Sequence, residues 1–380
     1  MPIKSLRIRN MGPFTDINLE FDKHANVLIG PNNCGKTTIL MALSEICIYP
    51  FSVDARFFRS NKRPKLNMNL FDQSLFIDQT LPWMTTSNDV KVMRELGYAV
   101  FIPALRQNTG FRPKSPMGRE EKRESGRIIG RMRDDEEDTE ELESYSNRIN
   151  YREEDINFLM KQKNEELPKE EEKELERRHL WISNNSRMTD RKIVSKIVEL
   201  DYRAYRKSEP RFREVVSIAT NIASEIMLGY SVVFDRIEED KRGLYPQFIT
   251  PDGPLSMDKL SQGTQSVMEW MYHIILGMAE YYDFPNDLVN KKAILIIDEI
   301  DAHMHPEWQR RIMTTLIKYL PNCQLFVSTH SPLILSGLGR GQIHLLTRGN
   351  RNKISDTKND SEIIGWSEVD PIVRTARGLN

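Results

Sequence analysis

The stretch that most constrains the fold is NVLIGPNNCGKTTIL, which runs from Asn26 to Leu40. Residues 30–37 fit the pattern G-x-x-x-x-G-K-[ST]. A short apolar run precedes the pattern, and TTILMALSEI follows it with the spacing of a helix. This combination predicts a buried strand, a tight glycine loop and a helix. Such a unit is a cradle for phosphate groups.

The chemistry of this loop requires these residue types. Gly30 and Gly35 let the backbone curl so that successive N–H groups face an anion. Lys36 offers a positive charge to the β- and γ-phosphates, and the hydroxyl of Thr37 is a ligand for Mg²⁺. The remaining loop and helix-start positions predicted to contact the nucleotide are Asn32, Asn33 and Thr38. The prediction is therefore an ATP site that uses Mg²⁺.

A second motif supplies acidic residues. In KKAILIIDEID, an apolar run ends in Asp298 and Glu299. An acid at the tip of a buried strand lies beside the phosphate loop in doubly wound folds. We expect Asp298 to hold Mg²⁺ and Glu299 to polarise the attacking water, so that Glu299 is catalytic.

The segment KLSQGTQS is weak evidence alone, but it precedes a long helical pattern and then the acidic strand. With this order of motifs the chain resembles the ABC-type ATPases, in particular the SMC/RecF/OLD branch, over about residues 2–38 and 254–332. The resemblance implies that Ser261 and Gly263 contact the γ-phosphate of a nucleotide bound to another subunit. It also implies an α/β P-loop ATPase head, a mixed sheet with helices on both faces.

Further family positions follow from the same resemblance. Asp301 corresponds to the aspartate of the D-loop, the segment after the acidic strand, and His330 in FVSTHSP to a catalytic switch histidine. Gln107 lies at the place in the order of motifs where the family has a glutamine that senses Mg²⁺ and the attacking water. The alternative is that Gln107 is an ordinary polar residue of a loop. His303 and His305 are expected to brace their loop rather than bind a metal, because no third ligand stands out nearby.

One position departs from the family. Cys34 stands where the family has a small residue such as glycine or serine. A thiol at a helix N-terminus beside a lysine has a route to redox sensitivity. A tolerated small side chain is the favoured interpretation.

The composition between the motifs changes sharply. The expected units are an N-terminal part of the head (1–111), a charged helical insertion (112–188) and a C-terminal part of the head (189–380). The insertion is basic to about residue 133, then acidic in DDEEDTEELE, and then periodic enough for a helical hairpin. A disordered charged loop is the alternative for its first half.

The overall composition excludes some classes of protein but says less about function than the motifs do. The net charge is −1, so electrostatics of the whole chain identify no partner. Three scattered cysteines argue against a disulfide scaffold and for a reducing compartment. Without an apolar run near the length of a membrane span, the protein is expected to be cytoplasmic, with no membrane partner.

The motifs together predict a homodimer with ATP sandwiched between phosphate loop and signature segment. The expected role is a switch that controls a separate effector, a nuclease or toxin, in bacterial anti-phage defence. One alternative is a RecF-like ATPase in DNA repair, in which basic segments such as YRAYRK meet DNA. Another is a non-catalytic scaffold that uses ATP only for assembly, against which the presence of Glu299 argues.

Overall fold

A computed structural model describes residues 2–48, 65–71, 76–80, 87–103, 190–207, 209–241 and 243–346. The predicted insertion at 112–188 and Gln107 lie outside the described residues. The same holds for the tail beyond residue 346.

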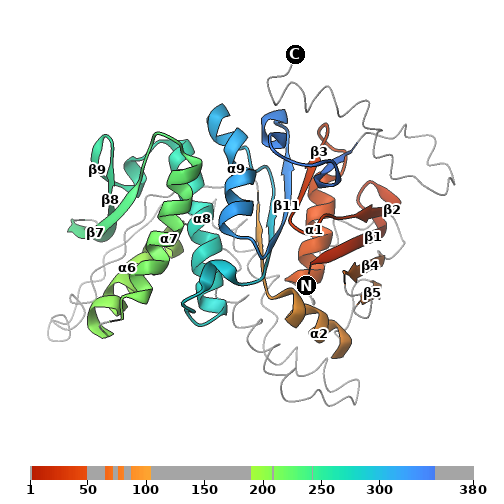
Figure 1. The fold of residues 1–380 in the computed structure, drawn as a ribbon, viewed down its shortest axis with the longest axis horizontal. Helices are drawn as coiled ribbons and strands as arrows, with labels where there is room; N and C mark the ends of the chain where they lie inside the picture. Colours follow the sequence, from red (N-terminus) through yellow and green to blue (C-terminus); the bar gives the residue numbers. More distant parts are fainter. Residues whose placement is uncertain are drawn as a thin grey trace, which may run out of the picture.

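The centre of the molecule is a five-stranded parallel sheet (Figure 1). Its order is β12 (Ile343–Leu345), β3 (Ala25–Ile29), β11 (Cys323–Thr329), β10 (Ala293–Ile297) and β6 (Tyr98–Ile102). Every residue of β3, β10 and β11 is buried, because helices or strands cover both faces. The apolar runs before each motif are therefore the central strands, as predicted.

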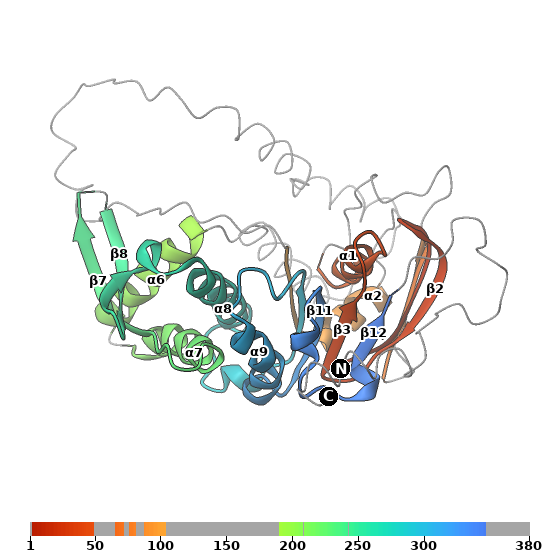
Figure 2. The same cartoon turned by 90° about the horizontal axis from the view of Figure 1, so that it is seen from above.

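One face of this sheet is covered by α1 (Lys36–Cys47). Figure 2 shows an antiparallel sheet beyond α1. Its order is β2 (Phe14–Glu20), β1 (Ile3–Met11), β4 (Lys65–Leu70) and β5 (Phe76–Thr80). The helix α2 (Ser87–Leu96) also contributes buried residues to this layer. Leu6 of β1, Leu40 of α1 and Phe326 of β11 belong to one apolar cluster that joins the three layers.

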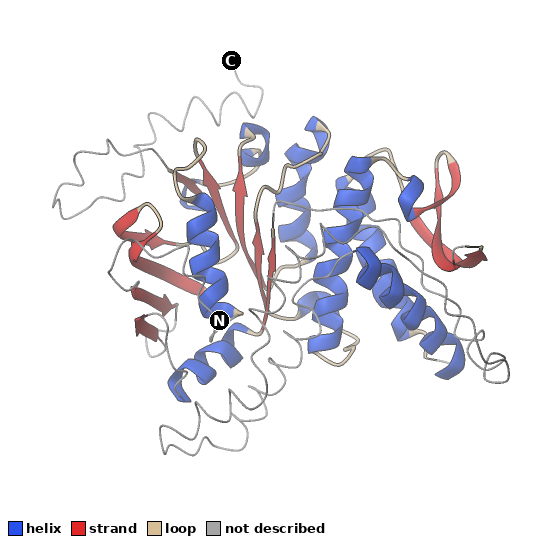
Figure 3. Cartoon of the chain, turned by 180° about the vertical axis from the view of Figure 1, so that it is seen from behind, coloured by secondary structure: helices blue, strands red, loops and turns tan. Residues whose placement is uncertain are grey.

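The opposite face packs against a helical layer, and a small third sheet lies beyond these helices (Figure 3). The helices are α6 (Asp190–Lys207), α7 (Arg211–Ile226), α8 (Gln262–Tyr281) and α9 (Pro306–Tyr319). The strands are β7 (Val233–Asp240), β8 (Gly243–Thr250) and β9 (Gly253–Ser256). Short 3-10 turns lie at η3 (Met257–Lys259), η4 (Leu288–Asn290), η5 (Pro332–Leu335) and η6 (Arg340–Gln342).

The predicted α/β class with helices on both faces is thus the observed one. The antiparallel strands form sheets of their own and do not extend the parallel sheet.

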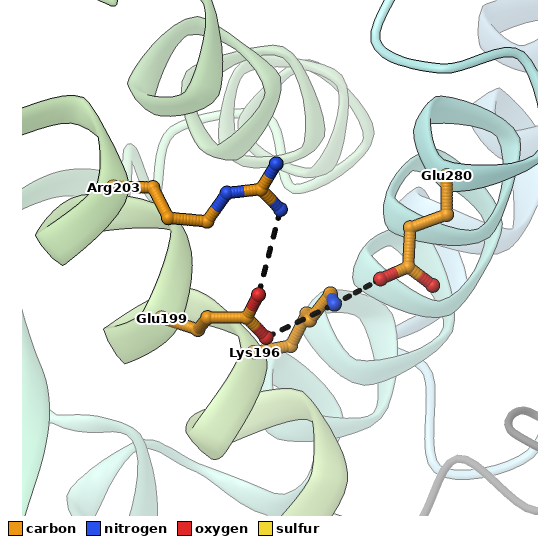
Figure 4. A network of polar contacts seen from close by, with 4 residues as sticks. All are labelled: Lys196, Glu199, Arg203 and Glu280. Carbon is orange, nitrogen blue, oxygen red and sulfur yellow. Dashed lines mark hydrogen bonds and ion pairs between the residues drawn. The ribbon is translucent and has the colours of Figure 1, made fainter. Parts of the chain in front are cut away.

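An ion-pair network fastens α6 to α8 (Figure 4). Lys196 of α6 pairs with Glu280 near the end of α8 and lies 3.1 Å from Glu199. Burial lowers the pKa of Lys196, but its bonds to Glu280 and Glu199 outweigh this, so the net pKa is raised. Arg203 joins Glu199 at 3.4 Å and stacks 4.1 Å from the ring centroid of Phe212 in α7. The helices of this layer are therefore held together by charge as well as by apolar contacts.

Candidate functional site

The phosphate loop connects β3 to α1 at the carboxyl end of the parallel sheet. Gly35 is the residue before the helix and has a φ of 103°, in the left-handed region that favours glycine. A Cβ there would lie 2.3 Å from the Phe14 ring, so the β1–β2 turn presses against the loop. The first turn of α1 has no side-chain cap and no acidic residue, which leaves its N-terminus suited to an anion.

Lys36 is held inside the loop. Its Nζ donates to the carbonyl oxygens of Gly30 at 2.8 Å and Pro31 at 3.0 Å, and only 6% of the residue is exposed. These carbonyls hold the ammonium group beside the loop that would surround a phosphate. Cys34 is buried, with its Sγ 3.9 Å from the same Nζ.

The remaining loop residues divide by exposure. Asn32 and Asn33 are exposed, and Asn33 adopts a left-handed φ of 62°. Thr38 is buried, 8% exposed, with its side chain against the backbone turn at Gly12. Of the two threonines, Thr37 is the exposed one.

The phosphate loop after β3 and the acidic turn after β10 meet at the carboxyl end of the parallel sheet, with β11 lying between the two strands. The Thr37 hydroxyl donates to Asp298 Oδ2 at 3.0 Å, although 261 residues separate the two in sequence. Asp298 is 6% exposed, and its other oxygen accepts a hydrogen bond from the hydroxyl of Ser328. The sequence expectation that Asp298 lies beside the phosphate loop agrees with this placement.

These oxygens fit a magnesium ion chemically. Mg²⁺ prefers oxygen ligands and is commonly bound by one or two protein groups plus waters and substrate phosphates. Thr37 and Asp298 supply a hydroxyl and a carboxylate at the mouth of the loop. No cluster of three or more His, Cys, Asp or Glu occurs in the described part of the chain, so an all-protein metal cage is absent there. Gln107, the third expected ligand, lies outside the described residues.

Unlike that of Asp298, the side chains of Glu299 and His330 make no hydrogen bond or ion pair within the described residues. Glu299 is partly exposed and has a φ of 49°, an unfavourable backbone angle for a residue with a side chain. His330 is exposed and directly follows β11. Within the described residues, neither side chain has a hydrogen-bond or ion-pair partner. Both are thus available to a substrate.

The signature segment begins α8. Ser261 is its N-cap, and its Oγ accepts the N–H of Thr264 at 3.2 Å. A Cβ on Gly263 would lie 2.6 Å from the carbonyl oxygen of His303. Glycine is needed here because the first turn of α8 rests directly on the loop that follows Glu299.

That loop is also fixed from the other side. Asp301 accepts the Thr329 hydroxyl at 2.5 Å, and the side chain of Gln309 donates to the Met304 carbonyl at 3.0 Å. His305 is the N-cap of α9 and accepts the Glu307 N–H through Nδ1 at 3.4 Å. The expectation that His305 braces the loop fits this bond.

The phosphate loop and the signature lie on different sides of the parallel sheet. The helix that follows the loop, α1, and the helix that begins with the signature, α8, flank β11 on opposite sides in Figures 1 and 2. Their buried residues belong to two separate apolar clusters. The structure therefore brings Lys36, Thr37 and Asp298 together but does not bring Ser261 to them.

Two contact groups were missed from the sequence, the hydroxyl pair Ser328–Thr329 and the His303 carbonyl. In FVSTHSP only the histidine attracted attention. The parallel pairing of Ile297 with Val327 already places position 328 beside position 298. The sequence shows only two hydroxyl residues at the end of this strand, and the register that sets Ser328 beside Asp298 comes from the structure.

A comparison with protein families decides the class. The family model described as "AAA domain, putative AbiEii toxin, Type IV TA system" matches residues 25–336. The chain belongs to this family. Membership in this AAA family makes it a nucleotide-binding protein of the ATPase class. None of the helices in the described residues is long and apolar enough to cross a membrane.

Individual relatives match over different lengths. The Septu protein PtuA of Bacillus thuringiensis is 22% identical over 349 residues, 87% of this chain and 72% of that protein. The Retron Vc95 probable ATPase of Vibrio cholerae serotype O1 biovar El Tor is 35% identical over 92 residues, 24% of this chain. The Retron Ec83 probable ATPase of Escherichia coli is 33% identical over 99 residues. The matched segments span 18% of each retron protein.

Among solved structures, the chain is similar to an Smc head domain from Pyrococcus furiosus bound to the C-terminal domain of ScpA. The TM-score is 0.45 at 15% identity, over 88% of this chain and 91% of that one. An SMC head domain from Thermotoga maritima has a TM-score of 0.42 at 10% identity, over 92% of this chain and 96% of that one.

Proposed function

We propose that the protein is an ATP-hydrolysing switch whose two copies close around two ATP molecules. The observation that carries this proposal is the division of the site. Lys36, Thr37 and Asp298 meet on one side of the molecule, while the signature residues Ser261 and Gly263 begin a helix on the other. A second copy placed head to tail would complete each half.

Each residue then has a role in the closed pair. Lys36 would neutralise the β- and γ-phosphates, and Thr37 with Asp298 would hold Mg²⁺, which supplies charge compensation on the phosphates. Glu299 would orient and polarise the attacking water, and His330 would contact the γ-phosphate. Their free side chains in the described residues support these roles. Ser261 and Gly263 of the second copy would contact the same γ-phosphate, with Asp301 at the subunit boundary.

The γ-phosphate makes the device a switch. It favours the closed pair because both copies contact it, and its removal takes away that preference. Relatives named for retrons and for Septu support a setting in bacterial anti-phage defence, with a nuclease or toxin as the controlled effector.

Substitution of Glu299 by glutamine tests the proposal. The change keeps the size of the side chain and removes the group that activates water, so ATP should accumulate uncleaved in a closed dimer. Light scattering after size exclusion should give twice the mass of one chain with ATP and Mg²⁺. The matched control, Lys36→Ala, should stay at the mass of one chain. A Glu299→Gln protein with the apo mass at every concentration of protein and ATP would refute the proposal.

A second candidate function is nucleic-acid binding on α6. Tyr205 is 85% exposed and Tyr202 is 49% exposed, with Arg206 exposed beside them. Exposed aromatic rings next to arginine suit stacking with single-stranded bases. Binding of labelled single-stranded DNA with and without ATP, across a salt series, tests it. Loss of binding in Tyr205→Ala without loss of ATPase activity would support it.

A further inference from the structure

The acidic turn after β10 is held by the last two residues of the neighbouring strand, β11. Ser328 and Thr329 are both 0% exposed. The turn comprises the four residues Asp298 to Asp301, and each of the four makes a hydrogen bond to one of these two residues.

Ser328 makes three of these contacts. Its hydroxyl donates to Asp298 Oδ1 and accepts the N–H of Glu299 at 2.8 Å. Its carbonyl accepts the N–H of Ile300 at 3.0 Å. A hydroxyl has one proton to donate, and Asp298 receives it. The serine therefore fixes the rotation of the Asp298 carboxylate and leaves the other oxygen, Oδ2, directed at Thr37.

The same hydroxyl holds an unfavourable backbone conformation. Glu299 has a φ of 49°, which costs energy for a residue with a Cβ and persists only where surrounding contacts impose it. The bond from the Glu299 N–H to Ser328 is such a contact. The Ser328 hydroxyl therefore helps to hold the backbone of Glu299 in this conformation.

Thr329 makes the fourth contact. Its hydroxyl donates to Asp301 Oδ1 at 2.5 Å and accepts the N–H of Ser331 at 2.9 Å. The threonine thus ties the D-loop aspartate to the residues on either side of His330.

We propose that Ser328 and Thr329 are positioning residues for the ATPase site, with separate duties. Ser328 orients the metal-binding carboxylate of Asp298 and the backbone of Glu299. Thr329 orients Asp301 toward the second copy. This inference rests on the proposed function, because the groups that are positioned are those assigned to Mg²⁺, water and the dimer boundary.

The first experiment measures metal binding. Mn²⁺ binding to the full chain is followed by electron paramagnetic resonance with a non-hydrolysable ATP analogue, and analogue binding in EDTA is followed by calorimetry. Ser328→Ala should weaken Mn²⁺ binding about ten-fold, as removal of a group that hydrogen-bonds a metal-binding carboxylate does, while analogue binding in EDTA stays unchanged. Cysteine is similar in size to serine, but its thiol is a weaker hydrogen-bond donor. The Mn²⁺ affinity of Ser328→Cys should therefore lie between those of the wild type and Ser328→Ala.

The matched control is Ser44→Ala. Ser44 is also buried, at 2% exposed, but its hydroxyl donates only to the carbonyl of Met41 in its own helix at 2.9 Å. It should bind Mn²⁺ as the wild type does. Equal Mn²⁺ binding by wild type, Ser328→Cys and Ser328→Ala would overturn the inference. Failure of the wild type to bind the analogue at all would overturn the proposed function instead.

The second experiment keeps the inference testable if Ser328→Ala does not fold. Thr329→Val preserves shape and removes only the hydroxyl. In the Glu299→Gln background it should bind Mn²⁺ and analogue normally but form the ATP-dependent dimer less, and Thr329→Ser should restore the dimer. A Thr329→Val protein that dimerises as fully as its parent would overturn the duty assigned to Thr329.

Discussion

A buried histidine on the edge strand β12 predicts how the stability of this fold depends on pH. His344 is 3% exposed, and its Nε2 lies 3.1 Å from Asn26 Oδ1. That oxygen is an amide acceptor, so Nε2 carries the proton of a neutral ring. In the described residues Nδ1 has no hydrogen-bond partner. Burial lowers the pKa of His344 from 6.5 to about 4, partly opposed by the carboxylate of Asp22.

The sign follows from proton binding. The unfolded chain takes up a proton on this ring near pH 6.5, while the folded chain resists it down to about pH 4. Stability from the neutral ring is therefore fully present above pH 6.5 and is lost as the pH falls toward 4. Between pH 7 and pH 5 the loss is about 2 kcal/mol, and the limit for the whole shift is about 3 kcal/mol.

The perturbation that isolates this effect is His344→Gln. The free energy of unfolding is measured by guanidinium titration at pH 7, 6 and 5, for wild type and variant. Other groups titrate in both proteins, so only the difference between their pH dependences is interpreted. The variant should lose about 2 kcal/mol less between pH 7 and pH 5 than wild type does. Equal losses would refute the assignment, as would an NMR titration that places the His344 pKa in its ordinary range.

Two further predictions concern contacts between elements. Gly263→Ala would press a methyl group on the His303 carbonyl, which lies 2.6 Å from the added Cβ, at a cost of about 1–3 kcal/mol. We expect a lower ATPase rate at saturating ATP with unchanged analogue binding, and a wild-type rate would contradict the contact. Glu280→Gln removes the negative charge that pairs with the half-buried Lys196 and should destabilise the protein by about 1–2 kcal/mol at pH 7. A double-mutant cycle with Lys196→Met measures the coupling, and additive effects would show that the pair contributes nothing.

Much of the central sheet could be predicted from the sequence because its strands are short and mostly apolar. The runs at 25–29, 293–297 and 323–329 are buried on both faces, so no alternation was needed to recognise them. The helix over Pro306–Tyr319 has a proline in its first turn and a lysine in its last, two signals in the sequence that favour a helix with these ends.

The elements that were missed have weaker local patterns. β4, with the sequence KLNMNL, alternates but carries two asparagines, which are depleted in strands. Its identity as a strand comes from pairing with β1, whose register joins Arg7 to Asn67 across some 60 residues of chain. β9 has four residues, including glycine and proline, and is a strand only because β8 provides its hydrogen bonds. In both cases tertiary pairing decided the outcome.

The residues of the candidate site also fall into those that the sequence predicted and those that it did not. Residues that a motif spaces along the chain, such as Gly35, Lys36 and Thr37, were found because the loop chemistry is local. Ser328 and Thr329, which hold the acidic turn, were not found. The sequence does not show whether a hydroxyl residue inside a strand only fills space or positions another side chain. The register of β10 with β11 creates that distinction.

The loop between β10 and α9 is where the two halves of the proposed site are connected within one chain. At its start Asp298 contacts Thr37 of the phosphate loop, and further along the His303 carbonyl supports Gly263 of the signature. Between them, Thr329 holds Asp301. A change at the metal-binding end thus has a continuous path of hydrogen bonds and close contacts to the signature, which in the closed pair would face the other nucleotide. The substitutions Ser328→Ala and Gly263→Ala test whether this path couples the two ends. Losses of function that add independently would show no coupling, and a loss shared by the two substitutions would show that the path couples them.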